Sequence, residues 1–556
     1  MSNKLDNPQK EEVKNMMVAM VLVTLIFFGF NYMNAPTKQS AENSAVVETI
    51  QSSDKPTEVI EGGATETAVQ EVVVQKTEPV TLENEYVKAS FDAALGGITD
   101  LSLLKYKESI EDDSKKVQLF NNDYFTNLMW QSKDVNLPHL NSLWVLNEEA
   151  STPTTKVFVF SNADVKIERI VSLDDKYMIS ITDKVYNLKD QPIKVYQQGS
   201  FERKMDQMPP VSTVHQGFVG FLNDELVEEK YADKPIIYSG RSSAGWFGLT
   251  DKYWQGLMVL GDDETVAVTF SSNKDKKYTA RFETDNILIP AQGNIEKKVM
   301  LFAGAKDIDV INDYQKSLNI KHFDLSLDFG WFRFLTQPFL HFLNYLYSLI
   351  GNMGVAIIVF ATLIRFAMLP IATKSYESMA KMRKVQPKLK QIQTRFKDDP
   401  RRLQMEMANL YKREKINPAS GCLPLLLQIP VFFALYKVLS ISINMRQAPF
   451  FGWIEDLSMP DPLTIFNGFG YFDWNVPAFL CIGIWPILMG ITMYVQQKLS
   501  PTPTTDNAQA KMMQFLPVIF TLMMASFASG LIIYWTWSNV LSIIQQKYIM
   551  KKVGVN

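Results

Sequence analysis

The feature that most constrains this chain is a long apolar stretch interrupted by a single charge. Between Pro338 and Lys374 the only formally charged side chain is Arg365. About 20 consecutive apolar residues cross the hydrocarbon core of a bilayer, so a stretch of this length predicts a transmembrane helix. An ionisable residue inside such a stretch indicates a functional site. The alternative is that Arg365 lies near the helix end and extends its guanidinium into the lipid headgroups. The stretch itself leaves both interpretations open.

Composition excludes several classes of protein. The 556 residues carry 56 Lys and Arg against 59 Asp and Glu, so no overall basic charge indicates nucleic-acid readout. Both cysteines, Cys422 and Cys481, lie in apolar stretches, which excludes a disulfide framework. The four histidines are scattered without metal-ligand spacing, and the common hydrolase, metalloprotease and phosphate-loop motifs do not occur. We therefore expect neither an enzyme nor a bound cofactor or metal.

The N-terminal region is predicted to contain a membrane anchor. Residues 1–15 are polar, and residues 16–33 form a short apolar segment. A cleaved signal peptide is the competing interpretation. Cleavage just before Pro36 would place Met33 where a small residue is usual, so we favour an uncleaved anchor. Residues 34–80 are rich in Thr, Ser, Glu and Gln with almost no aromatic residues, which predicts a flexible linker.

Residues 81–322 change to an alternating pattern of apolar and polar residues, as in KVFVF, VKIERIVSL and TVAVTF. Alternation rich in Val, Ile, Phe and Thr and broken by Asn, Asp and Gly predicts antiparallel strands. A region of this length is typical of a large β-sandwich domain. The side chains of Trp246, Phe247, Tyr253 and Trp254 could form an aromatic platform for a sugar. Packing in the core is the commoner reason for such a cluster.

The C-terminal half contains further apolar segments separated by polar ones. Residues 323–347 are aromatic and predict an amphipathic helix in the membrane interface. Lys437 lies toward the outer end of a later apolar segment. After the interfacial helix we expect five transmembrane helices, over 348–372, 421–443, 476–497, 512–528 and 530–546. The segments on the cytoplasmic side are a basic helical hairpin over 373–419, a loop over 498–511 and a tail over 547–556. A periplasmic loop covers 444–475.

The last uncharged stretch decides the topology. Residues 512–546 comprise 35 uncharged positions, and one helix of that length would extend about 52 Å, more than a hydrocarbon core of roughly 30 Å. Ser529 and Gly530 offer a turn that would divide it into two short helices. Two helices return the lysines of the tail to the side of the basic hairpin, as the positive-inside rule requires. We therefore expect six spans with both termini in the cytoplasm. Short final helices would also favour a locally thinned bilayer.

The hairpin at 373–419 carries thirteen Lys or Arg against five Asp or Glu. Apolar positions recur at helical spacing on both sides of Asp398-Asp399-Pro400, which predicts a turn between two helices. The simpler interpretation is that the loop only obeys the positive-inside rule. A two-helix arm with exposed methionines suits adaptable binding of apolar segments. The candidate receiving residues of this arm are Met379, Met382, Arg383, Met405 and Met407.

Several motifs of this half occur together in one known family. They are GWFRFLTQP (330–338), the G-N-x-G element at 351–354, MAKMRKVQPKLK (379–390), NPASGCLPLLLQIPVFFALY (417–436), RQAPFFGWIEDLS (446–458), KLSPTPTTD (498–506), FLPVIFT (515–521) and SGLIIYWTWSN (529–539). In this order they resemble the YidC/Oxa-type family of membrane protein insertases, in its Gram-negative form with a large periplasmic domain. The motifs cover most of 324–548. The N-terminal anchor and 81–322 match in architecture more than in motif.

The resemblance implies a location in the bacterial inner membrane, with a five-helix insertase core and an N-terminal anchor helix. The core would enclose a hydrophilic groove, and the periplasmic domain would be a β-supersandwich. The family's groove arginine corresponds to Arg365 and its substrate-contacting tyrosine to Tyr534, and Gln428 is a further candidate lining residue. The family's groove threonine corresponds to Ala361, so we take Thr362 beside it as a further candidate groove residue. The implied partners are nascent membrane proteins, the lipid bilayer, the Sec translocon, the ribosome and components of the signal recognition particle.

The expected mechanism follows from these residues and the resemblance. A nascent apolar segment meets the arm, its polar flank enters the groove beside Arg365, and the segment moves into lipid by hydrophobic transfer. No nucleotide is required. One alternative function is a secondary transporter with Arg365 as an anion site, but no inverted repeat is found. A second is an intramembrane hydrolase, for which the sequence lacks a nucleophile–base pair.

Overall fold

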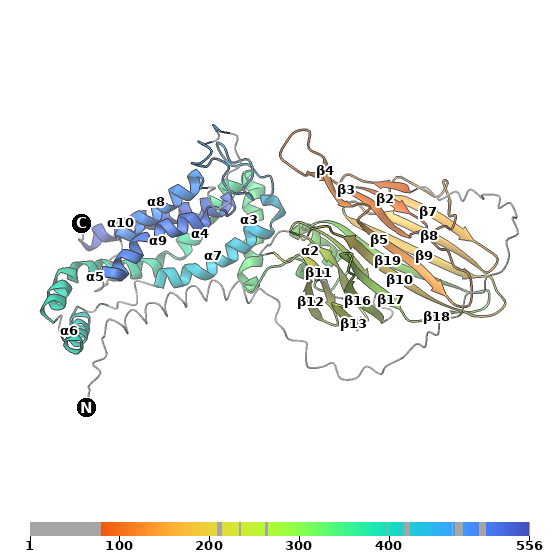
Figure 1. Cartoon of the computed structure of the whole chain (residues 1–556), viewed down its shortest axis with the longest axis horizontal. Helices are drawn as coiled ribbons and strands as arrows, with labels where there is room; N and C mark the ends of the chain where they lie inside the picture. The colour runs from red at the N-terminus through yellow and green to blue at the C-terminus, as the bar shows by residue number, and fades with distance from the viewer. Residues whose placement is uncertain are drawn as a thin grey trace, which may run out of the picture.

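The computed structural model describes residues 79–554, with gaps at 208, 210–213, 233–234, 262–264, 397–398, 415, 417–422, 470, 473–481 and 500–506. The predicted N-terminal tail and anchor, and nearly all of the predicted linker, lie outside the described residues. The described chain forms a β-domain followed by a helical domain, which lie end to end (Figure 1).

The alternating sequence of the β-domain is reflected in its burial. In β8 (Val165–Leu173) and β16 (Val266–Ser272), fully buried residues alternate with partly exposed ones, because successive side chains of a strand point to opposite faces. The other strands are β1 (Val80–Glu83), β2 (Val87–Asp92), β3 (Gly97–Lys107), β4 (Lys116–Phe120), β5 (Tyr124–Ser132), β6 (Val145–Leu146), β7 (Thr155–Ser161), β9 (Met178–Asn187), β10 (Ile193–Lys204), β11 (Gly217–Leu222), β12 (Glu225–Lys230), β13 (Tyr238–Ser242), β14 (Gly245–Thr250), β15 (Trp254–Leu260), β17 (Lys277–Thr284), β18 (Ile287–Ile289) and β19 (Asn294–Ala305).

The strands pair antiparallel in three sheets. One has the order β1-β2-β3-β4, the second β13-β16-β17-β10-β18 with β5 also paired to β10, and the third β12-β11-β14-β15-β19-β9-β8-β7-β6. Helix α2 (Ile308–Ser317) and the short 3-10 helix η1 (Phe323–Ser326) follow the last strand.

Aromatic side chains join the sheets into a sandwich. Phe218 of β11 stacks on Phe270 of β16 with ring centroids 5.0 Å apart, which links the third sheet to the second. Phe91 of β2 contacts Phe158 of β7 at 5.6 Å, which links the first sheet to the third. The predicted β-sandwich is confirmed, and the large apolar rings supply much of its buried surface.

The aromatic cluster considered as a sugar platform belongs mainly to this core. Trp246 and Phe247 are 0% exposed. The Trp246 indole N–H donates to the Lys321 carbonyl at 3.1 Å. Tyr253 is also buried, whereas Trp254 is partly exposed and packs against Tyr106. A platform needs accessible ring faces, so the platform interpretation is wrong for Trp246 and Phe247.

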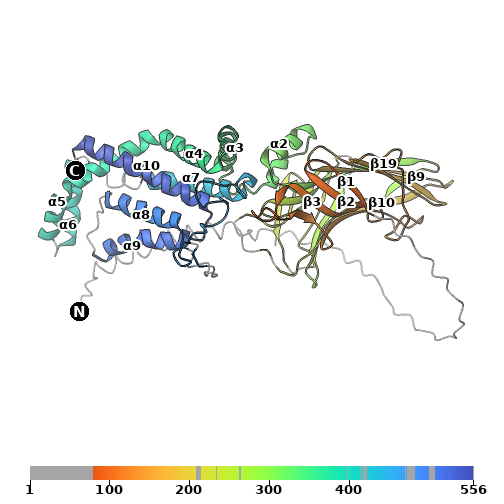
Figure 2. The same cartoon turned by 90° about the horizontal axis from the view of Figure 1, so that it is seen from above.

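The helical domain comprises α3 (Arg333–Ile350), α4 (Met353–Ala367), α5 (Leu369–Arg395), α6 (Pro400–Arg413), α7 (Leu423–Ile441), α8 (Ile484–Leu499), α9 (Asn507–Met524) and α10 (Ser529–Val553). Figure 2 shows α10 between α4 and α8, with α9 beyond α8. Within the described ranges no helix alone has the length and apolar composition of a membrane span. Helices α4 and α5 meet that criterion jointly, with a bend of 67° between them.

The G-N-x-G element explains the junction of α3 and α4. Gly351 ends α3 with a left-handed backbone, φ 76°, which favours glycine. The Asn352 side chain then caps α4 by accepting the Val355 amide at 3.0 Å. At Gly354 a Cβ atom would lie 2.1 Å from the Phe450 ring, so the close packing of α4 on the loop after α7 requires glycine.

The last uncharged stretch divides before the predicted turn. Residues 525–528 form the break, and Ser529 and Gly530 begin α10. Their amides donate to the carbonyls of Met459 and Leu457, at 2.8 and 3.0 Å, so the loop between α7 and α8 satisfies the first N–H groups of the helix. The prediction of two short final helices is wrong for α10. Its 25 residues extend about 37 Å because the helix continues through the basic tail. A helix of this length does not favour a thinned bilayer.

Candidate substrate groove

Arg365 lies in the last turn of α4 and is partly buried. Its Nη2 group donates to the Tyr376 hydroxyl of α5 at 2.9 Å and to the Ser542 hydroxyl of α10. The guanidinium therefore contacts two neighbouring helices. Its Nε–H is buried and has no hydrogen-bond partner among the described residues. Because the side chain offers five donors, Arg365 can still donate to an acceptor group of a bound segment.

The partner of Arg365 on α10 belongs to a polar stripe. Asn539, Ser542 and Gln546 are all buried on one face of that helix, at the spacing that places residues on the same side. The Asn539 amide donates to the Thr492 hydroxyl of α8 at 3.1 Å, and the Ser542 hydroxyl donates to the Ser538 carbonyl at 2.7 Å. The sequence analysis missed this stripe. Its signal was present, since these polar residues recur at helical spacing inside an uncharged stretch.

A second polar pair lies nearer the start of α10. The Gln428 amide of α7 donates to the Tyr534 hydroxyl at 2.8 Å. Tyr534 is 2% exposed and Gln428 is partly exposed. Tyr534 precedes Ser542 by eight residues, about 12 Å along the helix axis. Polar groups from α4, α5, α7 and α10 thus lie along the helical domain: Arg365, Tyr376, Gln428, Tyr534, Asn539 and Ser542. We take these residues as the candidates for the predicted groove and call them the polar groove.

Thr362, a candidate groove residue, makes two hydrogen bonds, neither of them to Arg365. Its hydroxyl donates to the Ile358 carbonyl one turn earlier at 2.8 Å and accepts the Trp537 indole N–H at 2.9 Å. Both bonds hold the threonine in the contact between α4 and α10. Arg365 makes its own hydrogen bonds elsewhere, to Tyr376 and Ser542. Thr362 therefore supports the wall next to the groove.

The arm consists of α5 and α6, and only part of its predicted surface is exposed. Met379 and Met382 are 8% and 5% exposed, so the expectation that they are exposed is wrong. Met379 packs with Ile549 of α10, and Met382 packs with other apolar residues of the arm. Met379 is buried because α5 lies along the C-terminal extension of α10, in a segment predicted to be a cytoplasmic tail, whereas Met382 is buried by apolar residues of the arm itself.

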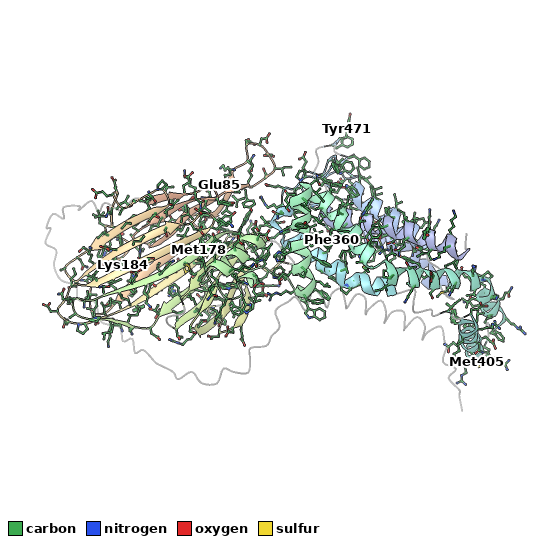
Figure 3. The ribbon with its side chains drawn as sticks, turned by 180° about the vertical axis from the view of Figure 1, so that it is seen from behind. Glu85, Met178, Lys184, Phe360, Met405 and Tyr471 are labelled. Atoms are coloured by element: carbon green, nitrogen blue, oxygen red, sulfur yellow. The ribbon has the colours of Figure 1, made fainter. Side chains whose placement is uncertain are left out.

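The remaining arm residues face outward or contact α10. Met405 of α6 is 56% exposed and lies at the end of the helical domain remote from the β-domain (Figure 3). Met407 is partly buried. Arg383 places Nη1 3.8 Å from the Met550 sulfur. Among the candidate receiving residues, the exposed one is Met405 on α6. Over the described ranges, no group of three His, Cys, Asp or Glu side chains is placed to hold a metal ion.

Comparison with known proteins identifies the family. A family profile described as "60Kd inner membrane protein" matches residues 345–555, and one described as "YidC periplasmic domain" matches residues 79–342. The "Membrane protein insertase YidC" of Rhizobium meliloti (strain 1021) is 36% identical over 574 residues, covering 98% of this chain and 96% of the relative. The chain belongs to the YidC family of membrane protein insertases.

A second relative gives the same result. The "Membrane protein insertase YidC" of Rickettsia bellii (strain OSU 85-389) is 37% identical over 555 residues, covering 97% of this chain and 99% of the relative. A solved structure titled "Active YidC insertase crystal structure with the first transmembrane domain resolved" has 17% identity and a TM-score of 0.37, covering 84% of this chain and 92% of that one.

Membership of the YidC family confirms the coarse predictions. The protein is an insertase of the inner membrane with a periplasmic β-domain, and its clients are newly made membrane proteins in a lipid bilayer. Insertion is a transport function, which points away from an enzyme. From here we call residues 79–322 the periplasmic domain.

Proposed function

We propose that the polar groove carries the hydrophilic flank of a client segment partway across the membrane. The observation that supports this role is the position of Arg365, which meets the hydroxyls of Tyr376 and Ser542 between apolar helices. A polar group in hydrocarbon costs several kcal/mol when nothing hydrogen-bonds to it. A positively charged, hydroxyl-rich channel lowers that cost for backbone groups and for acidic side chains.

The other steps of the proposed mechanism begin at the exposed surface of the arm. The apolar client segment first meets α6, where Met405 is exposed and where a flexible thioether adapts to many apolar partners. Its polar flank then enters the groove, and the segment leaves sideways into lipid because apolar transfer is favourable. This mechanism uses no nucleotide or cofactor. Cooperation with the Sec translocon, the ribosome and the signal recognition particle stays a prediction, and co-purification from native membranes tests it.

Photo-cross-linking tests the proposed order of contacts. A photoreactive residue is placed at Met405 in one variant and at Gln428 in another, and each is presented with ribosome-bound clients of increasing length. We expect capture at Met405 from shorter nascent chains than capture at Gln428, because the arm precedes the groove on the path. The matched control is Leu288, 59% exposed on the periplasmic domain. A photoreactive residue there should capture clients of none of these lengths. Equal capture at all three positions contradicts the path.

We further propose that both termini lie in the cytoplasm. Ser526 is exposed just before α10, and Lys551 is exposed in its last turn. In a background with Cys422 and Cys481 replaced by serine, an impermeant maleimide should label Ser526→Cys from the periplasmic side. It should reach Lys551→Cys only after the membrane is opened. Leu288→Cys is the periplasmic control. Labelling of Ser526→Cys and Lys551→Cys from one side contradicts the six-span topology.

A further inference from the structure

Several apolar side chains are exposed together in the loop between α7 and α8. They are 42% to 86% exposed, and residues 462–472 carry no charged side chain. Proteins rarely leave adjoining apolar side chains in water, so such a patch marks a contact surface. We call this group the aromatic tip: Ile465, Phe466, Phe469, Tyr471 and Phe472.

The backbone of the aromatic tip is held in a compact turn. The Thr464 amide donates to the Asn467 side-chain oxygen at 3.0 Å, and the Asn467 amide donates to the Thr464 hydroxyl at 3.2 Å. The Phe469 amide donates to the Thr464 carbonyl at 2.8 Å. Phe469 has a left-handed backbone, φ 57°, which is strained for a bulky residue. The Phe472 ring packs over Gly468, where a Cβ atom would lie 2.9 Å from it. The turn therefore presents its apolar side chains outward in one arrangement.

The base of the aromatic tip is joined to the start of α8. Asp461 is 3% exposed, and its carboxylate accepts the Trp453 indole N–H at 2.9 Å and the Trp485 amide at 2.8 Å. The Ile465 amide donates to the Ile482 carbonyl at 3.2 Å, just before α8 begins. Whatever binds the tip therefore also positions the first turn of α8.

The loop that carries the tip lies at the periplasmic end of the helical domain. Arg446 and Gln447 of this loop donate to carbonyls at the end of β3, at 3.0 and 3.1 Å. Other carbonyls of the loop accept the first amides of α10. Figure 3 shows Tyr471 at the side of the helical domain, whereas the periplasmic domain lies beyond the end of that domain. The tip therefore projects sideways, over the lipid that surrounds these helices.

We propose that the aromatic tip is a lipid-binding surface that inserts into the periplasmic leaflet of the membrane, with its rings between the phospholipid headgroups and the first methylenes of the acyl chains. A tyrosine ring settles at this level because its body is apolar and its end carries a hydroxyl. Removing the neighbouring apolar side chains from water is favourable, and no charge on residues 462–472 opposes the transfer.

A protein partner is the competing occupant of the tip. Lipid is favoured because the tip is built on the start of α8, so that the surface of the tip continues the lipid-facing surface of a membrane helix. Lipid binding fixes the depth of the start of α8 in the bilayer. This inference does not rest on the proposed function of the polar groove.

Fluorescence quenching tests the depth of the tip in the full-length protein. An environment-sensitive fluorophore is attached to Tyr471→Cys or to Ile465→Cys, with Cys422 and Cys481 replaced by serine. Vesicles of phosphatidylcholine and phosphatidylglycerol carry a nitroxide on the acyl chain, either near the headgroup or near the methyl end. We expect the nitroxide near the headgroup to lower the emission at both positions at least about twofold, and the other nitroxide to have a smaller effect. The matched control is Leu288→Cys on β18, which should not be quenched.

A second variant separates the tip from the apolar character of the fluorophore. Phe466→Ser and Phe469→Ser together should lower the quenching at Tyr471→Cys at least about twofold, because the rings that hold the tip in lipid are absent. Emission at Tyr471→Cys that neither nitroxide changes overturns the proposal, as does quenching that persists in the double variant.

Photo-cross-linking identifies the occupant directly. A photoreactive residue is placed at Phe472 of the full-length protein in native membranes, and the adducts are analysed by mass spectrometry. Phospholipid adducts support the proposal. A protein adduct as the main product overturns it in favour of a protein partner.

Discussion

Replacement of Asp183 by asparagine is expected to lower the free energy of unfolding of the periplasmic domain by about 3–5 kcal/mol, because it leaves a buried arginine without its counter-charge. Asp183 and Arg169 face each other across β9 and β8. Their side chains are 0% and 2% exposed and form two parallel hydrogen bonds, Nε to Oδ1 and Nη2 to Oδ2, both 2.7 Å. Such a bidentate pair has fixed geometry.

The same pair connects the three sheets. The Arg169 guanidinium donates to the Ala93 carbonyl at 3.1 Å, after the first sheet's β2, and to the Leu128 carbonyl at 3.2 Å in β5. The Trp130 indole of β5 donates to Asp183 at 2.8 Å. Loss of the carboxylate charge therefore weakens contacts between sheets, which is why the expected cost is several times that of a surface pair.

Denaturant unfolding of the purified full-length protein, followed by tryptophan fluorescence, measures this cost. The matched control is Glu296→Gln, which breaks the exposed pair of Lys184 and Glu296 on the same sheet. We expect the control to cost about 0–1 kcal/mol. A loss in Asp183→Asn no larger than that of the control contradicts the assigned role of the pair.

The strands could be predicted from the sequence, but their arrangement could not. The alternation in VKIERIVSL predicts a strand with one buried face, and β8 has that pattern. The pairing of β8 with β9 on one side and β7 on the other, and the connection of β5 to β10, depend on contacts between residues far apart in the chain. Period-two patterns determine which face is buried and say nothing about which strand is the neighbour.

The candidate groove could be predicted only in part, because its contacts also join residues on different helices. Arg365 is conspicuous as a single charge in an apolar stretch, whereas its partner Tyr376 lies beyond the 67° bend between α4 and α5. Pro370 at the start of α5 is a local signal for a break in the helix, but the direction of the bend depends on how the helices pack. The buried position of Met379 depends on the extension of α10 past Lys547, in a segment predicted to be a cytoplasmic tail, and that of Met382 depends on packing within the arm.

The second large effect is expected for Arg365→Ala. A unit charge pair 4 Å apart is worth about 4 kcal/mol at an effective dielectric constant near 20, before desolvation is subtracted. An acidic residue of a translocated tail gains this interaction in the groove, and a neutral tail does not. Arg365→Ala should therefore impair clients with acidic tails most. Arg365→Lys should retain much of the activity, because a point charge with three donors can still meet two hydroxyls and a carboxylate.

The measurement that tests this account most directly compares two single-span clients in proteoliposomes, one with an acidic translocated tail and one with that tail neutralised. Protease protection of the tail is scored for the parent, Arg365→Ala, Arg365→Lys and the control Lys498→Ala, which removes an exposed cation from the last turn of α8. We expect Arg365→Ala to reduce insertion of the acidic tail by at least about tenfold, with a smaller loss for the neutral tail. Equal insertion of both tails by Arg365→Ala and the parent would contradict the proposed role of Arg365 in the groove.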